Sequence, residues 1–123
     1  MSAPELRIGI KNDQRSFRPG ETLRGAAGWQ WDQAPESAEV RLYWRTEGKG
    51  VPDVSVVAVV PFEQLAARDA RPFEFRLPEG PYSFSGRLIS LIWGVELVLK
   101  PGAHAARVEF NLSPTGEEIL LHR

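Results

Sequence analysis

Side chains with the widest catalytic use are scarce in this chain. It contains two histidines, His104 and His122, and no cysteine. Histidine supplies most general bases and many metal ligands, whereas cysteine supplies thiolate nucleophiles and soft metal ligands. His104 follows Pro101-Gly102-Ala103, which is a turn sequence, and His122 is next to last, so neither is expected on a rigid scaffold. The sequence therefore predicts no catalytic residue, and a protein that is not an enzyme.

The carboxylates and glycines give no clearer sign of a catalytic or phosphate-binding site. Glu96 stands out because it lies inside the most apolar segment of the chain, and it has two interpretations. One is a buried functional acid. The other is a charge on the outer surface of a sheet, which is favoured because one face of an antiparallel sheet is commonly solvated. The aspartates are scattered and no phosphate-binding glycine motif is present. We expect no metal site and no cofactor.

Tryptophan can bind ligands by stacking, and Trp29 and Trp31 have the spacing for this. Residues two apart on a strand project from the same face. One interpretation is a platform for a carbohydrate or another small ligand. The other is filling of the hydrophobic core beside Gly25 and Ala27, which is favoured because tryptophan is highly buried on average.

A second candidate surface is a row of alternating residues, Arg41, Tyr43 and Arg45. They alternate with Val40, Leu42 and Trp44, so one face is apolar and the other carries arginine and tyrosine. Arginine and tyrosine are enriched at protein interfaces. The row is therefore a candidate protein-interaction face, with a plain solvated strand face as the alternative.

The elements that must position these residues have a period of two, which is typical of strands. Helical spacing occurs only where Phe62, Leu65 and Ala66 predict one short helical turn near residues 62–69. The tail segment Ile119-Leu120-Leu121 is either an added edge strand or a docking peptide. Strands are expected over residues 5–11, 22–31, 37–46, 54–60, 73–77, 87–100 and 106–112.

Length and charge narrow the class of protein further. The 123 residues are expected to form a single domain, 1–123, with a core over 5–112 and a tail over 113–123. A formal net charge of −1 gives no basic excess for nucleic acid. The longest apolar stretch, 88–99, is shorter than the about 20 residues of a membrane span. Lack of cysteine and of an apolar leader predicts a cytoplasmic location, and the arginine- and alanine-rich composition is typical of GC-rich bacteria.

Two segments carry a family resemblance. The first reads Phe17-Arg18-Pro19-Gly20-Glu21-Thr22-Leu23-Arg24-Gly25, and the second runs from Phe73 to Leu99. Their order, and a spacing of about fifty residues, resemble the pattern that marks arrestin-fold domains. The residues that match the pattern are Pro19, Gly20, Glu21, Gly25, Pro78, Pro81, Ser83, Gly86 and Trp93.

This resemblance agrees with the strand pattern, and both imply an all-β, immunoglobulin-like (arrestin-type) antiparallel β-sandwich of seven to eight strands. It also implies a non-catalytic protein-binding or scaffolding module with an unknown protein partner, including self-association through an edge strand. The stretch 7–11 lacks the adjacent lysines of eukaryotic arrestins, and the chain has room for one domain. The chain is therefore most similar to small bacterial arrestin-like proteins of the sporulation-control type.

Overall fold

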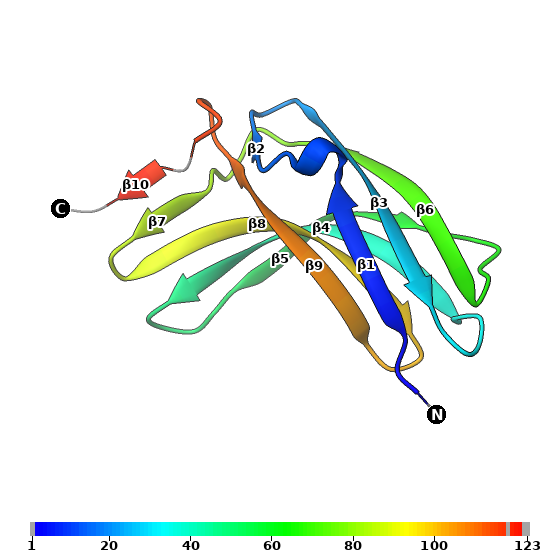
Figure 1. Cartoon of the computed structure of the whole chain (residues 1–123). Coiled ribbons are helices and arrows are strands. Elements are labelled where there is room, and N and C mark those ends of the chain that lie inside the picture. Colours follow the sequence, from blue (N-terminus) through cyan, green and yellow to red (C-terminus); the bar gives the residue numbers. More distant parts are fainter. Residues whose placement is uncertain (1, 118, 122–123) are drawn as a thin grey trace.

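The computed structural model describes residues 2–117 and 119–121, which fold into two packed β-sheets (Figure 1). One short 3₁₀ turn, η1 (Lys11–Asp13), follows the first strand. The strands are β1 (Glu5–Ile10), β2 (Ser16–Phe17), β3 (Thr22–Gln30), β4 (Ser37–Gly48), β5 (Val54–Pro61), β6 (Arg68–Arg76), β7 (Phe84–Gly86), β8 (Ile89–Lys100), β9 (His104–Leu112) and β10 (Ile119–Leu121).

The larger sheet is built around β8 and β4, the two longest strands. These two strands pair along their whole length, from Ser37 opposite Lys100 to Gly48 opposite Ile89. On its other side β8 pairs first with the short β7 and then, from Trp93 to Leu99, with β9. Strand β5 pairs with β4 and ends the order β10-β7-β8-β4-β5, while β2 adds to β9.

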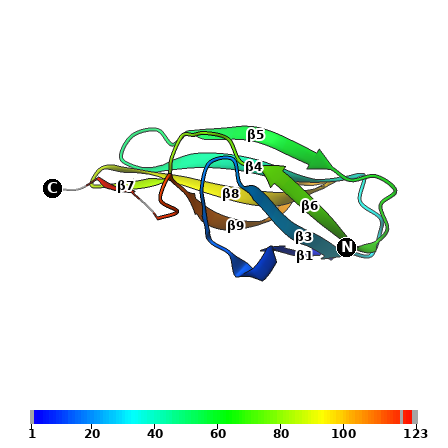
Figure 2. The same ribbon diagram turned by 90° about the horizontal axis from the view of Figure 1, so that it is seen from above.

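The smaller sheet is antiparallel and has the order β1-β3-β6. Its three strands come from distant parts of the sequence, because β4 and β5 lie between β3 and β6 in the chain. Figure 2 shows this sheet packed beneath the larger one, with β5 and β4 on the opposite side of the sandwich from β1.

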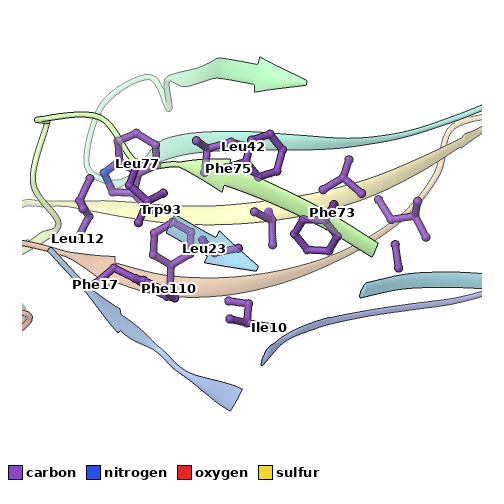
Figure 3. Close-up of a cluster of buried hydrophobic side chains, with 14 of the residues drawn as sticks. Ile10, Phe17, Leu23, Leu42, Phe73, Phe75, Leu77, Trp93, Phe110 and Leu112 are labelled. Carbon is purple, nitrogen blue, oxygen red and sulfur yellow. The ribbon is translucent and has the colours of Figure 1, made fainter. Parts of the chain in front are cut away.

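One hydrophobic core lies between the sheets. Alternate residues of each long strand point into it, as in Val40 and Leu42 of β4 and Val95 and Leu97 of β8. Figure 3 shows the aromatic side chains that fill it, and Trp93 and Phe110 lie 6.2 Å apart between ring centres. Fully burying one such large apolar side chain stabilises the fold by about 1.5–3 kcal/mol, so this core holds the two sheets together.

The two motifs behind the family resemblance meet in space. The amide of Gly20 donates to the carbonyl of Leu77 at 3.0 Å, and the amide of Leu77 donates to the carbonyl of Glu21 at 2.9 Å. Gly20 has a φ of 84°, a conformation that glycine adopts without steric cost. Farther along β3, the ring of Phe73 lies where a side chain on Gly25 would have to be. The motif residues therefore join β3 to β6.

The second motif also anchors the segment before β8. The indole nitrogen of Trp93 donates to the carbonyl of Pro81 at 2.6 Å. Ser83 is buried and binds Leu112 twice, since its amide donates to the Leu112 carbonyl and its hydroxyl accepts from the Leu112 amide. Pro78 follows the end of β6 and Gly86 ends β7. These bonds fasten the 78–86 segment to both β8 and β9.

The expected helical turn near residues 62–69 is wrong. Residues 62–67 form a loop in which Gln64 has a positive φ of 56°, and β6 already begins at Arg68. Phe62 and Leu65 pack against the core from this loop, which explains their helix-like spacing. Arg71 holds the loop by donating to the carbonyls of Glu63 and Gln64 at 2.8 Å each.

The other expected strands are confirmed, with shifted ends. The described residues form ten strands instead of seven or eight because three very short ones are added, β2, β7 and β10. Two of the added pairings are parallel, β2 with β9 and β10 with β7, so the sandwich is not wholly antiparallel. Of the two expectations for the tail, the structure shows the added edge strand, with Ile119 opposite Phe84.

Candidate functional site

The candidate site lies on β5, the last strand of the larger sheet. This strand pairs with β4 on one side, and in the described part of the chain no strand pairs with its other side. Figure 2 shows β5 along the rim of the sheet. Residues 54–60 read Val-Ser-Val-Val-Ala-Val-Val and carry no charge. Proteins commonly protect an edge strand with charges, proline or a β-bulge. This stretch carries no charge, and its protection is limited to one bulge and to Pro61 at the end of the strand.

Four valines of β5 are exposed, and we call them the valine stripe. Their exposed fractions are 63% for Val54, 48% for Val56, 44% for Val57 and 44% for Val59. Isolated exposed apolar residues are normal on a protein surface, but a contiguous group marks an interaction site or an aggregation hazard. The valine stripe is therefore a candidate interaction surface.

A β-bulge places all four valines on the outer face. Leu42 pairs with Ala58 and Tyr43 pairs with Val56, so Val57 has no partner on β4. Such an extra residue shifts the alternation by one position. Val54 and Val56 on one side of the bulge therefore share a face with Val57 and Val59 on the other side, while Ala58 and Val60 pack against the core.

The predicted face of Arg41, Tyr43 and Arg45 borders this stripe directly. In the register between the two strands, Arg41 lies opposite Val59, Tyr43 opposite Val56, and Arg45 opposite Val54. Two surfaces that the sequence suggested separately, the row on β4 and an open sheet edge, are thus neighbours on one face of the sandwich.

Tyr43 itself differs from the expectation of a surface contact. It is only 5% exposed, because Gly94 opposite it has no side chain and the ring lies across that position. Its hydroxyl is buried and has no hydrogen-bond partner among the described residues. Burial is the largest cause that raises the pKa of Tyr43 above its usual value of 10.0. The ring therefore supports the sheet and is not available to a partner.

The two arginines of the row form ion pairs within the chain. Arg45 donates to Glu109 at 2.7 Å and to Glu47 at 2.9 Å, and these hydrogen bonds raise the pKa of its guanidinium. Arg41 pairs with Glu39. Pairs at a solvated surface contribute about 0–1 kcal/mol and exchange partners at little cost. The outer face therefore combines an apolar stripe with arginines whose charge is already balanced.

Glu96 is part of the same outer surface. Its side chain is 18% exposed and accepts a hydrogen bond from Arg107 at 2.9 Å. It pairs across the sheet with Arg41 on β4 and with Arg107 on β9. Of the two interpretations of this residue, the structure favours a charge on the sheet surface.

Trp29 and Trp31 do not form a ligand platform. Trp29 is fully buried, and its indole nitrogen donates to the carbonyl of Ala66 at 2.9 Å. Trp31 is half-buried, donates to the carbonyl of Ser2, and packs edge-on against His104 with 5.4 Å between ring centres. The platform interpretation is wrong, and the alternative of core filling is confirmed for Trp29.

Within residues 2–117 and 119–121, no group of three histidine, aspartate or glutamate side chains is placed to hold a metal ion. His104 lies at the start of β9 against Trp31, and the second histidine, His122, lies outside the described residues. In the same part of the chain, no helix has the length and apolar character needed to cross a membrane.

A groove of about 790 Å³ lies beside the smaller sheet and reaches the end of β5. Its polar rim includes an ion pair between Arg24 and Glu74, with 3.4 Å between nitrogen and oxygen. It contains none of the residues singled out as interaction face or platform. The groove is lined by Gly9, Ile10, Lys11, Arg24, Gly25, Ala26, Val60, Pro72, Phe73 and Glu74.

Sequence reasoning missed the valine stripe as a site. Residues 54–60 were expected as a strand, but a dense apolar strand is typical of a buried position. The signal that was present is the pair Val56-Val57, since two adjacent apolar residues inside an alternating run indicate a change of phase. The exposure of both residues depends on the position of β5 at the rim of the sheet, which the local sequence does not encode.

The two sheets, the turn at Pro19-Gly20-Glu21 and the anchored segment before Trp93 define an arrestin-like β-sandwich, as the sequence motifs predicted. Among solved structures, the sporulation control protein Spo0M from Bacillus subtilis has this fold and matches with a TM-score of 0.65. The match covers 92% of this chain and 50% of Spo0M at 12% identity, so the chain spans about half the length of that protein. No family model and no curated protein sequence matches the chain.

Proposed function

We propose that this chain is a non-catalytic protein-binding module whose contact surface is the outer face and free edge of β5. The observation that carries the proposal is the uncharged, exposed valine stripe on an unpaired edge strand. A free edge offers main-chain amides and carbonyls to a partner strand, and this mode of recognition is common in peptide-binding domains.

Covering the valine stripe would supply part of the binding free energy of such a contact. The valine stripe is about half exposed on average, so covering it contributes roughly 3 kcal/mol, taking about 1.5 kcal/mol for each valine moved fully out of water. Main-chain hydrogen bonds along the edge add affinity and direction. Arg41 and Arg45 border the stripe, and interfaces typically have an apolar centre with arginine nearby. A partner is therefore held by the stripe and oriented by the edge.

The outer face of the larger sheet also carries Arg–Glu ion pairs, as in Arg41 with Glu39 and Arg107 with Glu96. We place this binding role in the bacterial cytoplasm, because a chain without cysteine fits a reducing compartment.

A photocrosslinking amino acid at position 57 tests the proposal. The matched control carries the same amino acid at Gln30, which is exposed on the smaller sheet. We expect position 57 to give one defined protein adduct at native concentration, and position 30 to give none. The adduct should disappear when Val56→Lys is added to the position-57 variant. No adduct at position 57, or equal adducts at both positions, would refute the proposed surface.

A further inference from the structure

We propose that the partner of the valine stripe is a second copy of this chain, with the two β5 strands antiparallel about a two-fold axis between Val56 and Val57. This inference rests on the proposed function and gives its partner a chemical identity. The result is a continuous sheet that runs from β9 of one copy, through both β5 strands, to β9 of the other.

The bulge makes this register self-consistent. In an antiparallel pair, residues directly opposite each other point to the same face. With the axis between Val56 and Val57, each of these valines lies opposite the other in the second copy, and Val54 lies opposite Val59. All four point outward, and the inward Ser55 lies opposite the inward Ala58.

An unbulged strand does not permit such pairing. There, neighbouring residues point to opposite faces, so a two-fold axis between two residues would set each outward side chain against an inward one. The unpartnered Val57 removes this conflict. The same feature that gathers the valines on one face therefore also permits the register in which all four valines of one copy face those of the other.

Charge does not oppose the pairing. No charged side chain occurs between Val54 and Val60, and Arg41 and Arg45 are each paired with a glutamate of their own chain. Asp53, which precedes the strand, falls at opposite ends of the pair in the two copies. The two aspartates are then roughly 20 Å apart at about 3.3 Å per residue, well beyond the screening length of about 8 Å in physiological salt.

The ends of the strand limit the length of the pairing. Pro52 and Pro61 flank the apolar run, and proline has no amide hydrogen to donate to a neighbouring strand. The Val60 end also approaches Pro72 and Phe73 of β6 across the groove. The pairing therefore spans residues 54–59 of each copy. A contact of this size is smaller than a standard stable interface, so we expect dissociation in roughly the micromolar range.

The first test is the molar mass of the purified full chain as a function of concentration, measured by sedimentation equilibrium. The natural sequence is expected to shift from monomer to dimer. Val57→Lys places a charge at the centre of the pair and should raise the dissociation constant about tenfold or more. The matched control is Val51→Lys, since Val51 is 92% exposed and lies outside the strand. Circular dichroism shows whether both variants are folded.

The second test measures the register of the two β5 strands by disulfide formation. The chain has no native cysteine, so any disulfide comes from the introduced residues. Chains carrying Val54→Cys and chains carrying Val59→Cys are mixed and oxidised, and a disulfide-linked heterodimer is expected. Val54→Cys alone should give no disulfide, because the two copies of residue 54 are then roughly 15 Å apart and a disulfide needs Cβ atoms about 4 Å apart.

Three results would overturn the inference. They are a monomer at every concentration, a dimer that Val57→Lys leaves unchanged, and efficient oxidation of Val54→Cys with itself. The first of these leaves the proposed function standing when position 57 crosslinks to a different protein. An adduct with twice the mass of this chain supports both proposals together.

Discussion

Removing the hydroxyl of Tyr43 should make this protein more stable. Most substitutions of buried residues lower the free energy of unfolding, so a predicted increase is an informative test. Among the described residues the hydroxyl oxygen is buried without a hydrogen-bond partner, while the ring packs across Gly94. Tyr43→Phe keeps the ring in place and removes only the group that lost its water on folding.

The magnitude follows from the cost of an unsatisfied buried polar group, which is about 1–3 kcal/mol. We take the lower end because the side chain retains 5% exposure at a sheet surface. The free energy of unfolding should therefore rise by about 1 kcal/mol. For a domain of this length, that corresponds to an increase in Tm of about 3–5 °C.

The assay is denaturant unfolding at neutral pH, with an unchanged slope required for a valid comparison. Tyr82→Phe is the control, because Tyr82 is the other tyrosine of the chain and is 36% exposed. Its effect should stay within about 0.5 kcal/mol. This control also leaves Tyr43 as the sole tyrosine, so its ionisation can be followed by absorbance and should occur above the usual pKa of about 10.

The pH dependence has a definite sign. Because burial raises the pKa of Tyr43, the folded state holds the phenol proton more tightly than the unfolded state. This contribution to stability is present below the unfolded pKa and is lost as pH rises through the folded pKa. The advantage of Tyr43→Phe should therefore grow in alkaline solution. A loss of about 1 kcal/mol or more at neutral pH would mean that the hydroxyl is satisfied, and would refute the reasoning.

Two further predictions concern the smaller sheet. Gly25→Ala should destabilise by about 2 kcal/mol or more, because its methyl group would collide with the backbone carbonyl of Gly9 and lie 2.6 Å from the Phe73 ring. Gly9→Ala, with nothing within 4 Å, is the control, and equal denaturation midpoints for the two variants would contradict the close packing. Asp69→Asn should lower the free energy of unfolding by about 1–2 kcal/mol at neutral pH. The hydrogen bonds from Arg71 lower the pKa of Asp69, so its contribution to stability is lost as pH falls through the folded pKa. The variant should therefore lose less stability in acid than the natural sequence. Asp13→Asn, at an exposed pair with Arg15, is the control, and parallel acid unfolding curves for all three proteins would refute the role of Asp69.

The long strands were predictable from the sequence because their alternation reflects a buried face. Val40 and Leu42 alternate with Glu39, Arg41 and Tyr43, and both are buried in the structure. The turn at Pro19-Gly20-Glu21 and the segment before Trp93 were recognisable for the same local reason, since each needs particular backbone conformations and side chains. Their hydrogen bonds to one another, through Leu77, were not visible in either motif alone.

The candidate site was only partly predictable. The alternation that placed Tyr43 on the outer face was correct, but its burial depends on Gly94, which is distant in sequence and opposite it in the sheet. In the same way, the valine run indicated a strand but not its place at the rim. The loop after β5 misled because Phe62 and Leu65 reach the core with the spacing of a helix.

The order of strands in the smaller sheet has a consequence for synthesis. Strand β3 cannot pair with β6 until the chain has been made through Arg76, whereas β4 and β5 are neighbours in sequence and can form a hairpin earlier. Pairings between distant segments form slowly, and unpaired edges are prone to aggregation in the meantime. A hairpin that forms at that stage would carry the uncharged valine edge before the core has closed. We expect yield in the cell, as well as assembly, to depend on how soon that edge is covered.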